Sequence, residues 1–475
     1  MDVLFSQGLA ARHFGTAALG DVRRVRRLVD TADHILRHPI GTLPQKLENW
    51  AELMGLYRLV AAEEVTHQAV LAPHRQQVLA RMGEHEGVVL LLHDASELNY
   101  THVDALHDQL GQIGSGQGCG RGYIAQHTLA VTPQRQVLGL VNQTLHRRRA
   151  VPEGETQAQR RKHPQRESRL WLAGCDACGD VPEGCTWIDI ADRGGDTFEF
   201  LSYEHAHGRR YVIRSAKDRR LDGTDHVGDD RIHDHLHQYT RDLPTLGTRS
   251  IEVPAKAGKS KARQAQVRVA AAPVSLGPNR WTRGEHDGKT LHLWVIHVQE
   301  VDAPAGSPGL PVGVAPLEWI LLSNLPAEHF EQACQLIDFY ACRPLIEEYH
   351  KAIKTGMGIE QLQFEHADRL EPAIALLSVV AALLLQLRHA ARQRDAQVTP
   401  ARTIVPLIFV RVLSAKLRGQ VRDDLSVREF LFGVASLGGH LGRKGDGPPG
   451  WLTLWRGWND LQLMVQGALA LRGAG

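Results

Sequence analysis

Cysteine is scarce in this chain, which has only six among 475 residues. So few cysteines over this length do not make a disulfide framework, and we expect free thiols in a reducing compartment, the cytoplasm. The N-terminal segment 1–15 lacks the apolar core and the cleavage site of a signal peptide. The most apolar run, 373–385, is too short to span a bilayer and predicts a buried helix. We therefore expect no membrane partner.

Excess charge is also small, because 55 Lys and Arg residues stand against 53 Asp and Glu residues and leave a net charge of +2. The balance alone does not indicate a polyanion partner, but the basic residues are unevenly placed. They cluster at 23–27, 147–169 and 256–268. Such local patches fit a polyanion, whereas the alternative for each is a solvated loop or helix face. With 43% hydrophobic and 23% charged residues, the chain is globular and long enough for two to four domains.

The first of these clusters lies on a predicted amphipathic helix, 18–36. Apolar side chains follow one side of the helix, and four arginines crowd the other: Arg23, Arg24, Arg26 and Arg27. A short arginine-rich helix can lie across a DNA backbone or enter the major groove. The alternative is an ordinary helix of a soluble bundle. Further helices at 47–59 and 65–82 make 1–82 a small helical domain.

An α/β pattern begins at about residue 83. The apolar run 87–93 has the length of a strand and leads to Asp94, and the strand-like segment 186–191 leads to Asp192. Sheets of this class place their functional sites at the carboxyl ends of strands. From about 221 to 316 alternating segments separated by Gly, Pro and Lys predict an inserted β-rich subdomain. The core returns with the strand 317–323.

The late segment YACRPLIEEYHKAIK, 340–354, carries a second candidate feature. Read as a helix at about 100° per residue, it places Tyr340, Arg343, Glu347 and Lys354 on one stripe. A carboxylate flanked by cations suits a metal-dependent phosphate enzyme, and the alternative is a salt-bridged surface helix. Pro344 either kinks this helix or begins a new one.

Asp94, Asp192 and Glu347 together could hold two divalent ions about 4 Å apart for phosphodiester chemistry. Oxygen ligands without histidine favour Mg²⁺, with Mn²⁺ as a substitute.

Two other features leave alternatives open. Cys175, Cys178 and Cys185 form a C-x2-C-x6-C pattern, which is either ordinary thiols in a turn or part of a zinc site. A zinc site needs a fourth ligand, for which His163 or His205 is only a guess. The helically spaced tail residues Trp451, Trp455, Trp458, Leu461 and Met464 indicate either core packing or a subunit interface.

The pattern Y-x2-R-x3-E-x6-K of residues 340–354 resembles the YREK signature of the DDE transposases of the insertion-sequence-four family. EEYHKAIKTG (347–356), LLQLR (384–388), ALGDVRR (18–24) and GWLTLWRGW (450–458) are similar to segments of the same family. So is the segment from Asp192 to Asp196. The resemblance covers nearly the whole chain.

The resemblance implies a ribonuclease-H-like core interrupted by the β-rich insertion, with helical domains at both ends. The implied domains are 1–82 for DNA-end binding, 83–220 and 317–390 for the core, 221–316 for the insertion and 391–475 for dimerisation. It also implies a cut-and-paste transposase and endonuclease that acts on the double-stranded inverted repeats of an insertion sequence and on target DNA, through a hairpin. A homodimer in the synaptic complex, in a bacterial cytoplasm and at the nucleoid, belongs to the same expectation.

The resemblance further assigns roles to single residues. Asp94, Asp192 and Glu347 would be the catalytic, metal-binding triad. Tyr340, Arg343, Lys354 and Arg214 would bind backbone phosphates, Trp319 would stack on a flipped base, and the arginines of 23–27 would read the inverted repeat. The alternatives are a catalytically inactive DNA-end-binding repressor and another ribonuclease-H-like nuclease.

Overall fold

The computed structural model describes residues 8–47, 49–114, 119–222, 235–253, 263–278, 288–301, 316–393, 395–443 and 446–473. Parts of the predicted insertion 221–316 and of the basic cluster 256–268 therefore lie outside the described residues. The chain forms two compact units. The first unit comprises Met1–His85, Ala95–Glu153 and Leu345–Gly475, and the second comprises Glu86–Asp94 and Gly154–Pro344.

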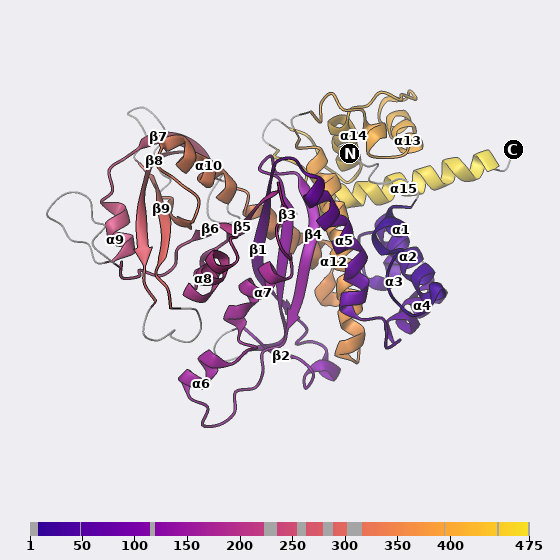
Figure 1. Cartoon of the computed structure of the whole chain (residues 1–475). Helices are drawn as coiled ribbons and strands as arrows, with labels where there is room; N and C mark the ends of the chain where they lie inside the picture. The colour runs from indigo at the N-terminus through magenta and orange to yellow at the C-terminus, as the bar shows by residue number, and fades with distance from the viewer. Residues whose placement is uncertain are drawn as a thin grey trace. The chain divides into compact units, whose positions relative to one another are not determined.

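The first unit is mainly helical (Figure 1). Its N-terminal helices are α1 (Leu9–Phe14), α2 (Val22–Arg37), α3 (Leu43–Lys46), α4 (Trp50–Val60) and α5 (His67–Glu84). Its later helices are α11 (Pro344–Lys351), α12 (Ala367–Ala390), α13 (Leu407–Arg418), α14 (Val427–Leu437) and α15 (Trp451–Gly473). Its strands β2 (Gly111–Ile113), β3 (Gly120–Val131) and β4 (Val137–His146) form an antiparallel meander. Single-turn segments are η1 (Asp104–Leu106), η4 (Ala352–Gly356), η5 (Ile359–Gln361) and η6 (Ala401–Thr403).

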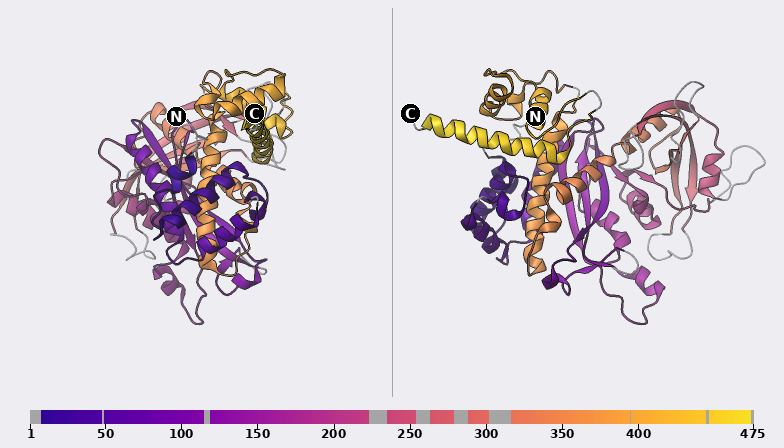
Figure 2. Two further views of the ribbon diagram at one scale, coloured as in Figure 1. Left: turned by 90° about the vertical axis from the view of Figure 1, so that its right-hand side faces the viewer. Right: turned by 180° about the vertical axis from the view of Figure 1, so that it is seen from behind.

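Helix α12 forms the centre of this unit. It contacts α2, α4 and α5 and also strand β4, and Figure 2 shows these segments around it. The side chains of α12 are apolar on all faces of the helix, as expected for a helix that is buried on every side. By length and composition α12 could cross a membrane, but 94% of its most apolar window is buried inside the protein. That burial is typical of a core helix.

The tryptophan-rich tail forms a second core within this unit. Trp455, Trp458 and Leu461 of α15 are fully buried, and the ring of Trp458 stacks on Phe409 with centroids 5.3 Å apart. At Gly457 a Cβ atom would lie only 1.8 Å from the carbonyl oxygen of Val434, so glycine allows α14 and α15 to approach closely. Trp455, Trp458 and Leu461 of the tail therefore pack in the core. A further role of the tail in a subunit interface stays a prediction.

The second unit is built on a mixed sheet with the strand order β1-β5-β6-β10-β9-β8-β7. The strands are β1 (Val88–Asn99), β5 (Thr186–Ala191), β6 (Arg210–Arg214), β7 (Gly247–Val253), β8 (Arg263–Leu276), β9 (Leu291–Glu300) and β10 (Glu318–Ser323). The helices are α6 (Gln157–Lys162), α7 (Leu170–Asp176), α8 (Phe198–Ala206), α9 (Leu236–Arg241) and α10 (Phe330–Tyr340), and the single turns are η2 (Glu167–Arg169) and η3 (Arg193–Gly195). Strands β1, β5 and β6 run parallel, and the remaining strands pair antiparallel.

The apolar run at the start of β1 is explained by this topology. Val89–Leu92 are fully buried because β1 pairs in parallel with β5, and parallel strands are covered on both faces. The prediction that the strand ends at residue 93 is wrong, since β1 continues to Asn99. Its parallel pairing nevertheless ends at His93 opposite Ala191, so Asp94 directly follows the last paired residue.

The described part of the predicted β-rich insertion continues the same sheet. Strands β7, β8 and β9 lie side by side in Figure 1, and β9 pairs with β10, which in turn pairs with β6. The insertion therefore extends the sheet of the second unit by hydrogen bonding. The expected α/β class with helical N- and C-terminal regions is confirmed, whereas the ribonuclease-H-like nature of the core stays a prediction.

Candidate active site and DNA-binding region

Two of the predicted acids lie next to each other at the ends of neighbouring parallel strands. Asp94 follows His93 on β1, and Asp192 follows Ala191 on β5, where His93 and Ala191 are the last paired residues. Parallel register therefore brings the two carboxylates to the same edge of the sheet, as the sequence predicted.

A single cation holds these two carboxylates. Nη2 of Arg343 donates a hydrogen bond to Oδ2 of Asp94 at 2.9 Å and another to Oδ2 of Asp192 at 3.3 Å. The side chains of Arg343 and Asp94 are 15% and 13% exposed, so water screens this interaction only weakly. Two like charges this close need a positive charge between them, and here the guanidinium supplies it.

The backbone fixes the orientation of Asp192. Its Oδ1 atom accepts a hydrogen bond from the amide of Gly194 at 2.7 Å, which caps the short turn η3. A Cβ atom at position 194 would lie 2.5 Å from the ring of Trp171. Glycine is therefore needed at this position, and Oδ2 of Asp192 remains directed to Arg343.

The segment 340–354 is not one continuous helix. Helix α10 ends at Tyr340 and α11 begins at Pro344, because proline lacks the amide hydrogen needed inside a helix but fits its first turn. Lys354 lies in the following π-helical turn η4. The single stripe predicted from a spacing of 100° is therefore wrong for Tyr340, Arg343 and Lys354.

Glu347 lies in the first turn of α11 and belongs to the first unit, together with Lys354. The ammonium group of Lys354 lies 3.6 Å from a carboxylate oxygen of Glu360. Glu347 follows Arg343 by one helical turn along the chain. The convergence of Glu347 with Asp94 and Asp192 stays a prediction.

The predicted aromatic and basic DNA contacts meet within the second unit. The rings of Trp319 and Tyr340 pack edge to face with centroids 5.1 Å apart. Arg214 lies opposite Leu321 in the antiparallel pair of β6 and β10 and donates a hydrogen bond to the carbonyl of Glu318 at 2.8 Å. Burial raises the pKa of the Tyr340 hydroxyl, although the charge of Arg214 opposes this. Contacts of these side chains with DNA stay predictions.

Asp196, in the segment similar to the transposase family, has a structural role. Its side chain is fully buried and accepts hydrogen bonds from the amides of Ala216 at 2.6 Å and Lys217 at 2.9 Å. It also forms an ion pair with Arg219. These contacts hold the loop that follows β6 and so fix the end of the strand that carries Arg214.

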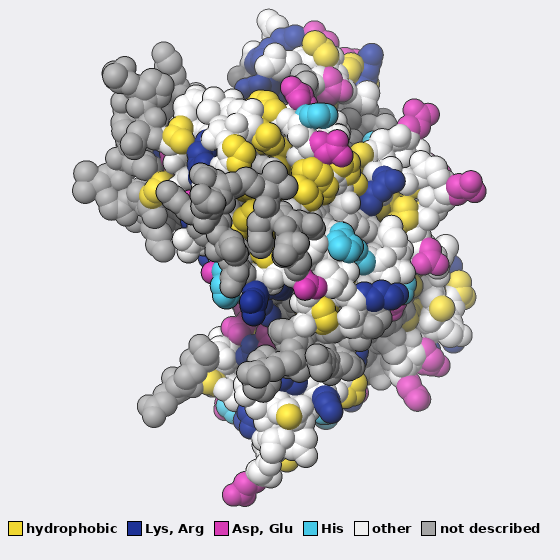
Figure 3. All heavy atoms as spheres, turned by 60° about the vertical axis from the view of Figure 1, so that its left-hand side comes forward, with side chains coloured by type: hydrophobic (Ala, Val, Ile, Leu, Met, Phe, Trp, Pro, Cys, Tyr) yellow, Lys and Arg dark blue, Asp and Glu magenta, His cyan; other side chains and the backbone are white. Residues whose placement is uncertain are grey.

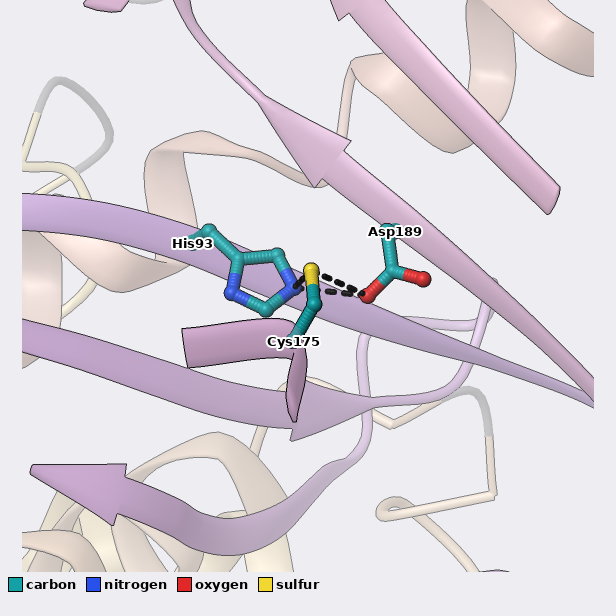
Figure 4. Close-up of side chains that lie close together, drawn as sticks. All are labelled: His93, Cys175 and Asp189. Carbon is teal, nitrogen blue, oxygen red and sulfur yellow. Dashed lines mark hydrogen bonds and ion pairs between the residues drawn. The ribbon is translucent and has the colours of Figure 1, made fainter. Parts of the chain in front are cut away.

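A buried polar cluster lies directly beneath the paired aspartates. His93, Cys175 and Asp189 point toward one another from β1, α7 and β5 (Figure 4). Burial tends to raise the pKa of the Asp189 carboxyl, but the charge of Arg209 and the hydrogen bond of His93 outweigh it and lower that pKa. Burial also raises the pKa of the Cys175 thiol.

Sequence reasoning did not single out Asp189, Arg209 or His93. The available signal was a carboxylate in the middle of an otherwise apolar strand, TWIDIA, because an unpaired charge there would be very costly. Its partner Arg209 directly precedes the next strand, β6. No local sequence pattern connects the two residues, so the pairing could not be inferred from the sequence.

The four N-terminal arginines divide into two pairs. Arg24 pairs with Glu64, and Arg27 pairs with Glu52. These ion pairs hold α2 against α4 and the segment that follows α4. Arg23 and Arg26 are exposed at the first turns of α2, and Arg23 pairs with Asp21 at the start of the helix. Arg23 and Arg26 are therefore the more exposed of the two pairs.

The basic cluster 147–169 is partly engaged in internal ion pairs. Arg166 and Arg169 both pair with Glu199 on α8. On the face that Figure 3 presents, Lys and Arg side chains of the described residues lie dispersed among acidic, histidine and apolar side chains.

Comparison with known protein families gives a match within the first unit. Residues 6–65 match the family model described as transposase DNA-binding. The match includes all of α2 and both pairs of arginines. The N-terminal region is therefore a DNA-binding region of the transposase type, which indicates that this protein processes DNA.

Proposed function

We propose that this chain is a cut-and-paste DNA transposase of the DDE type. The transposase-type DNA-binding region supports DNA as the substrate and transposition as the process. The observation that supports catalysis is the pair of carboxylates, Asp94 and Asp192, brought to one nitrogen of Arg343 at the end of parallel strands. The insertion-sequence-four family and its YREK signature belong to this proposal.

The donor set fits the expected metal. Asp94 and Asp192 offer hard carboxylate oxygens, and these oxygens already lie around one positive charge. We assign Asp94, Asp192 and Glu347 as the residues that would hold two Mg²⁺ ions, with Mn²⁺ as a substitute. Bound there, the ions would activate a water or a 3′-hydroxyl group and stabilise the leaving oxygen of a phosphodiester.

The other side chains would bind and orient the DNA. Arg343 would exchange its carboxylate partners for a backbone phosphate, because the carboxylates then have other cations and guanidinium binds phosphate well. Arg214 and Lys354 would hold further phosphates. Trp319, supported by the ring of Tyr340, would stack on a base turned out of the duplex when the strand bends into a hairpin.

Recognition and assembly would lie outside the catalytic centre. Arg23 and Arg26 would bind the inverted repeat, and the C-terminal helices would join two copies in a synaptic complex. The protein would act in the bacterial cytoplasm, at the nucleoid.

The test is a cleavage assay with Mg²⁺ on two DNA duplexes of equal length. One carries the inverted repeat found in the genomic DNA that flanks the gene, and the other carries the same bases in scrambled order. Wild-type protein should cut the repeat end, and Asp94→Ala should bind this end but not cut it. Equal cutting of both duplexes would indicate a general nuclease, and no cutting by either protein would indicate an end-binding repressor.

A further inference from the structure

The buried cluster beneath the aspartates brings together three different metal-ligating groups. Nε2 of His93 lies 2.7 Å from Oδ1 of Asp189, and Sγ of Cys175 lies 3.4 Å from Nε2 of His93 and 3.3 Å from Oδ1 of Asp189. All three side chains are buried. The dashed lines of Figure 4 converge on these atoms.

These spacings are close to those around a zinc ion. Ligand atoms of tetrahedral zinc lie about 3.2–3.7 Å apart, given bonds of about 2.0–2.3 Å. Both sulfur distances fall in this range. Only His93 and Asp189 would have to separate, by about half an ångström, as their hydrogen bond is replaced by two metal bonds.

Glu204 on α8 provides a second, independent observation. Its side chain is fully buried, and no hydrogen bond of ordinary geometry reaches its carboxylate oxygens among the described residues, although Cys175 and Asp189 lie close beside it. It interacts electrostatically with Asp189 and Cys175, and Nε of Arg209 lies 3.8 Å from Oε2. Burial and the charge of Asp189 raise the pKa of the Glu204 carboxyl, so a further cation beside it would favour the carboxylate form.

We propose that His93, Cys175 and Asp189 bind one structural zinc ion, and that Glu204, which lies outside their 4.8 Å cluster, moves in as the fourth ligand. Zinc binding converts the thiol of Cys175 to a thiolate and the acid of Glu204 to a carboxylate, and both protons are released to solvent. The two charges of zinc and the charge of Arg209 then balance the thiolate and the two carboxylates. Four protein ligands leave no open position, which is typical of a structural rather than a catalytic site.

The site would position the catalytic aspartates. His93 directly precedes Asp94, and Asp189 lies three residues before Asp192 on the neighbouring strand. An ion that joins β1, β5, α7 and α8 would therefore lock the strand ends that carry both acids. Of the three clustered cysteines in the sequence, only Cys175 would be a ligand, and neither His163 nor His205 would be.

The first measurement uses the full-length protein without DNA. The protein is loaded with zinc, passed over a desalting column in Mg²⁺ buffer with a weak chelator, and analysed by mass spectrometry for metals. We expect about one zinc per chain, because Mg²⁺ does not displace zinc from a thiolate site. A content below roughly one ion in ten chains would overturn the proposal.

Variants then locate the ion. Cys175→Ala should lose the zinc, whereas Cys334→Ala, a half-buried cysteine of the same unit outside the cluster, should retain it. Glu204→Gln should bind zinc at least tenfold more weakly. Equal zinc content in Cys175→Ala and Cys334→Ala would refute the site.

Cobalt substitution of the wild-type protein keeps the test valid if Cys175→Ala does not fold. A cysteine thiolate bound to Co²⁺ gives a charge-transfer band in the near ultraviolet, and tetrahedral ligands give strong visible bands. Absence of the charge-transfer band would overturn the proposal. Zinc content and cobalt absorption do not depend on DNA cleavage. The zinc proposal can therefore fail while the proposed transposase activity holds, and the reverse is also true.

Discussion

Arg343 donates a hydrogen bond from Nη2 to Oδ2 of Asp94 at 2.9 Å, and the same nitrogen reaches Oδ2 of Asp192 at 3.3 Å. This nitrogen lies where a cation bound by both carboxylates would have its positive charge. The guanidinium therefore offsets part of the repulsion between the two carboxylates. Under the proposed mechanism it would leave them when a divalent ion binds, and Arg343 would then link metal binding to phosphate binding.

Replacement of Arg343 by alanine should make the stability of the protein depend on Mg²⁺. Without the guanidinium, Asp94 and Asp192 repel each other, which we expect to cost about 1–3 kcal/mol and to lower the melting temperature by several degrees in EDTA. Mg²⁺ should restore most of this loss. Thermal unfolding with EDTA and with Mg²⁺ measures the effect.

The matched control is Arg249→Ala, since Arg249 pairs with Asp338 within the same unit at 2.8 Å, away from the two acids. Its melting temperature should respond to Mg²⁺ as the wild type does. If Arg343→Ala also responds like the wild type, the carboxylate pair does not bind the ion.

Glu347 and Glu348 are adjacent, but substitution should affect them in different ways. Glu347→Gln should remain folded and lose cleavage by roughly a thousandfold or more, because one carboxylate of the metal site is removed. Glu348 pairs instead with Arg388, His389 and Arg392. Glu348→Gln should therefore lose stability and keep its cleavage rate per folded molecule.

Circular dichroism and cleavage rates at a temperature where both variants are folded separate the two effects. If Glu348→Gln is fully folded but does not cleave DNA, the assignment of the catalytic role to Glu347 is wrong.

The ion pairs of Glu348 also predict how stability depends on pH. Burial tends to raise the pKa of this carboxyl, but the hydrogen bond of His389 and the charges of Arg392 and Arg388 outweigh it and lower the pKa well below its ordinary value. A lowered pKa stabilises the folded state above the ordinary pKa of about 4.3, and this contribution is lost as the pH falls further.

Urea unfolding between about pH 5 and pH 3 tests this contribution. The wild type should lose stability steeply in this range, and Glu348→Gln should lose it less steeply. His389 contributes in a different range, because burial lowers its pKa and its effect begins below about pH 6.5. Parallel curves for the two proteins between pH 5 and pH 3 would contradict the prediction.

The division of the N-terminal arginines predicts two kinds of variant. Arg26→Ala should weaken DNA binding and reduce the slope of log affinity against log salt by about 0.9, as expected for one lost phosphate contact. Arg27→Ala should instead destabilise the helical region, because Arg27 pairs with Glu52. Fluorescence anisotropy at several salt concentrations and thermal unfolding measure the two effects. An unchanged salt slope in Arg26→Ala would exclude a phosphate contact.

Much of this arrangement follows from local sequence patterns. The apolar runs before Asp94 and Asp192 predicted buried strands, and parallel pairing then brings their ends together. The arginines of α2 predicted a DNA-binding helix within a region that matches a transposase DNA-binding family. The strand predictions succeed because they depend on periodicity and on the residue that follows an apolar run, which are local properties, whereas DNA contacts of the single arginines stay predictions.

The pairing of distant side chains could not be obtained in this way. A helical spacing placed Arg343 on the stripe of Glu347, but Pro344 ends that helix, and Arg343 instead binds Asp94 and Asp192. The cysteine pattern left ordinary thiols and part of a zinc site as alternatives, and only the fold shows that Cys175 lies beside His93 and Asp189 of two neighbouring strands.

By itself, then, the sequence determined which segments become strands and helices, and which two acids follow the apolar strand segments. Only the tertiary structure decided which polar side chains meet, because the hydrogen bonds of the two clusters join residues 14 to 249 positions apart. Such contacts depend on the register of strands and on helix ends, and a single proline is enough to change them.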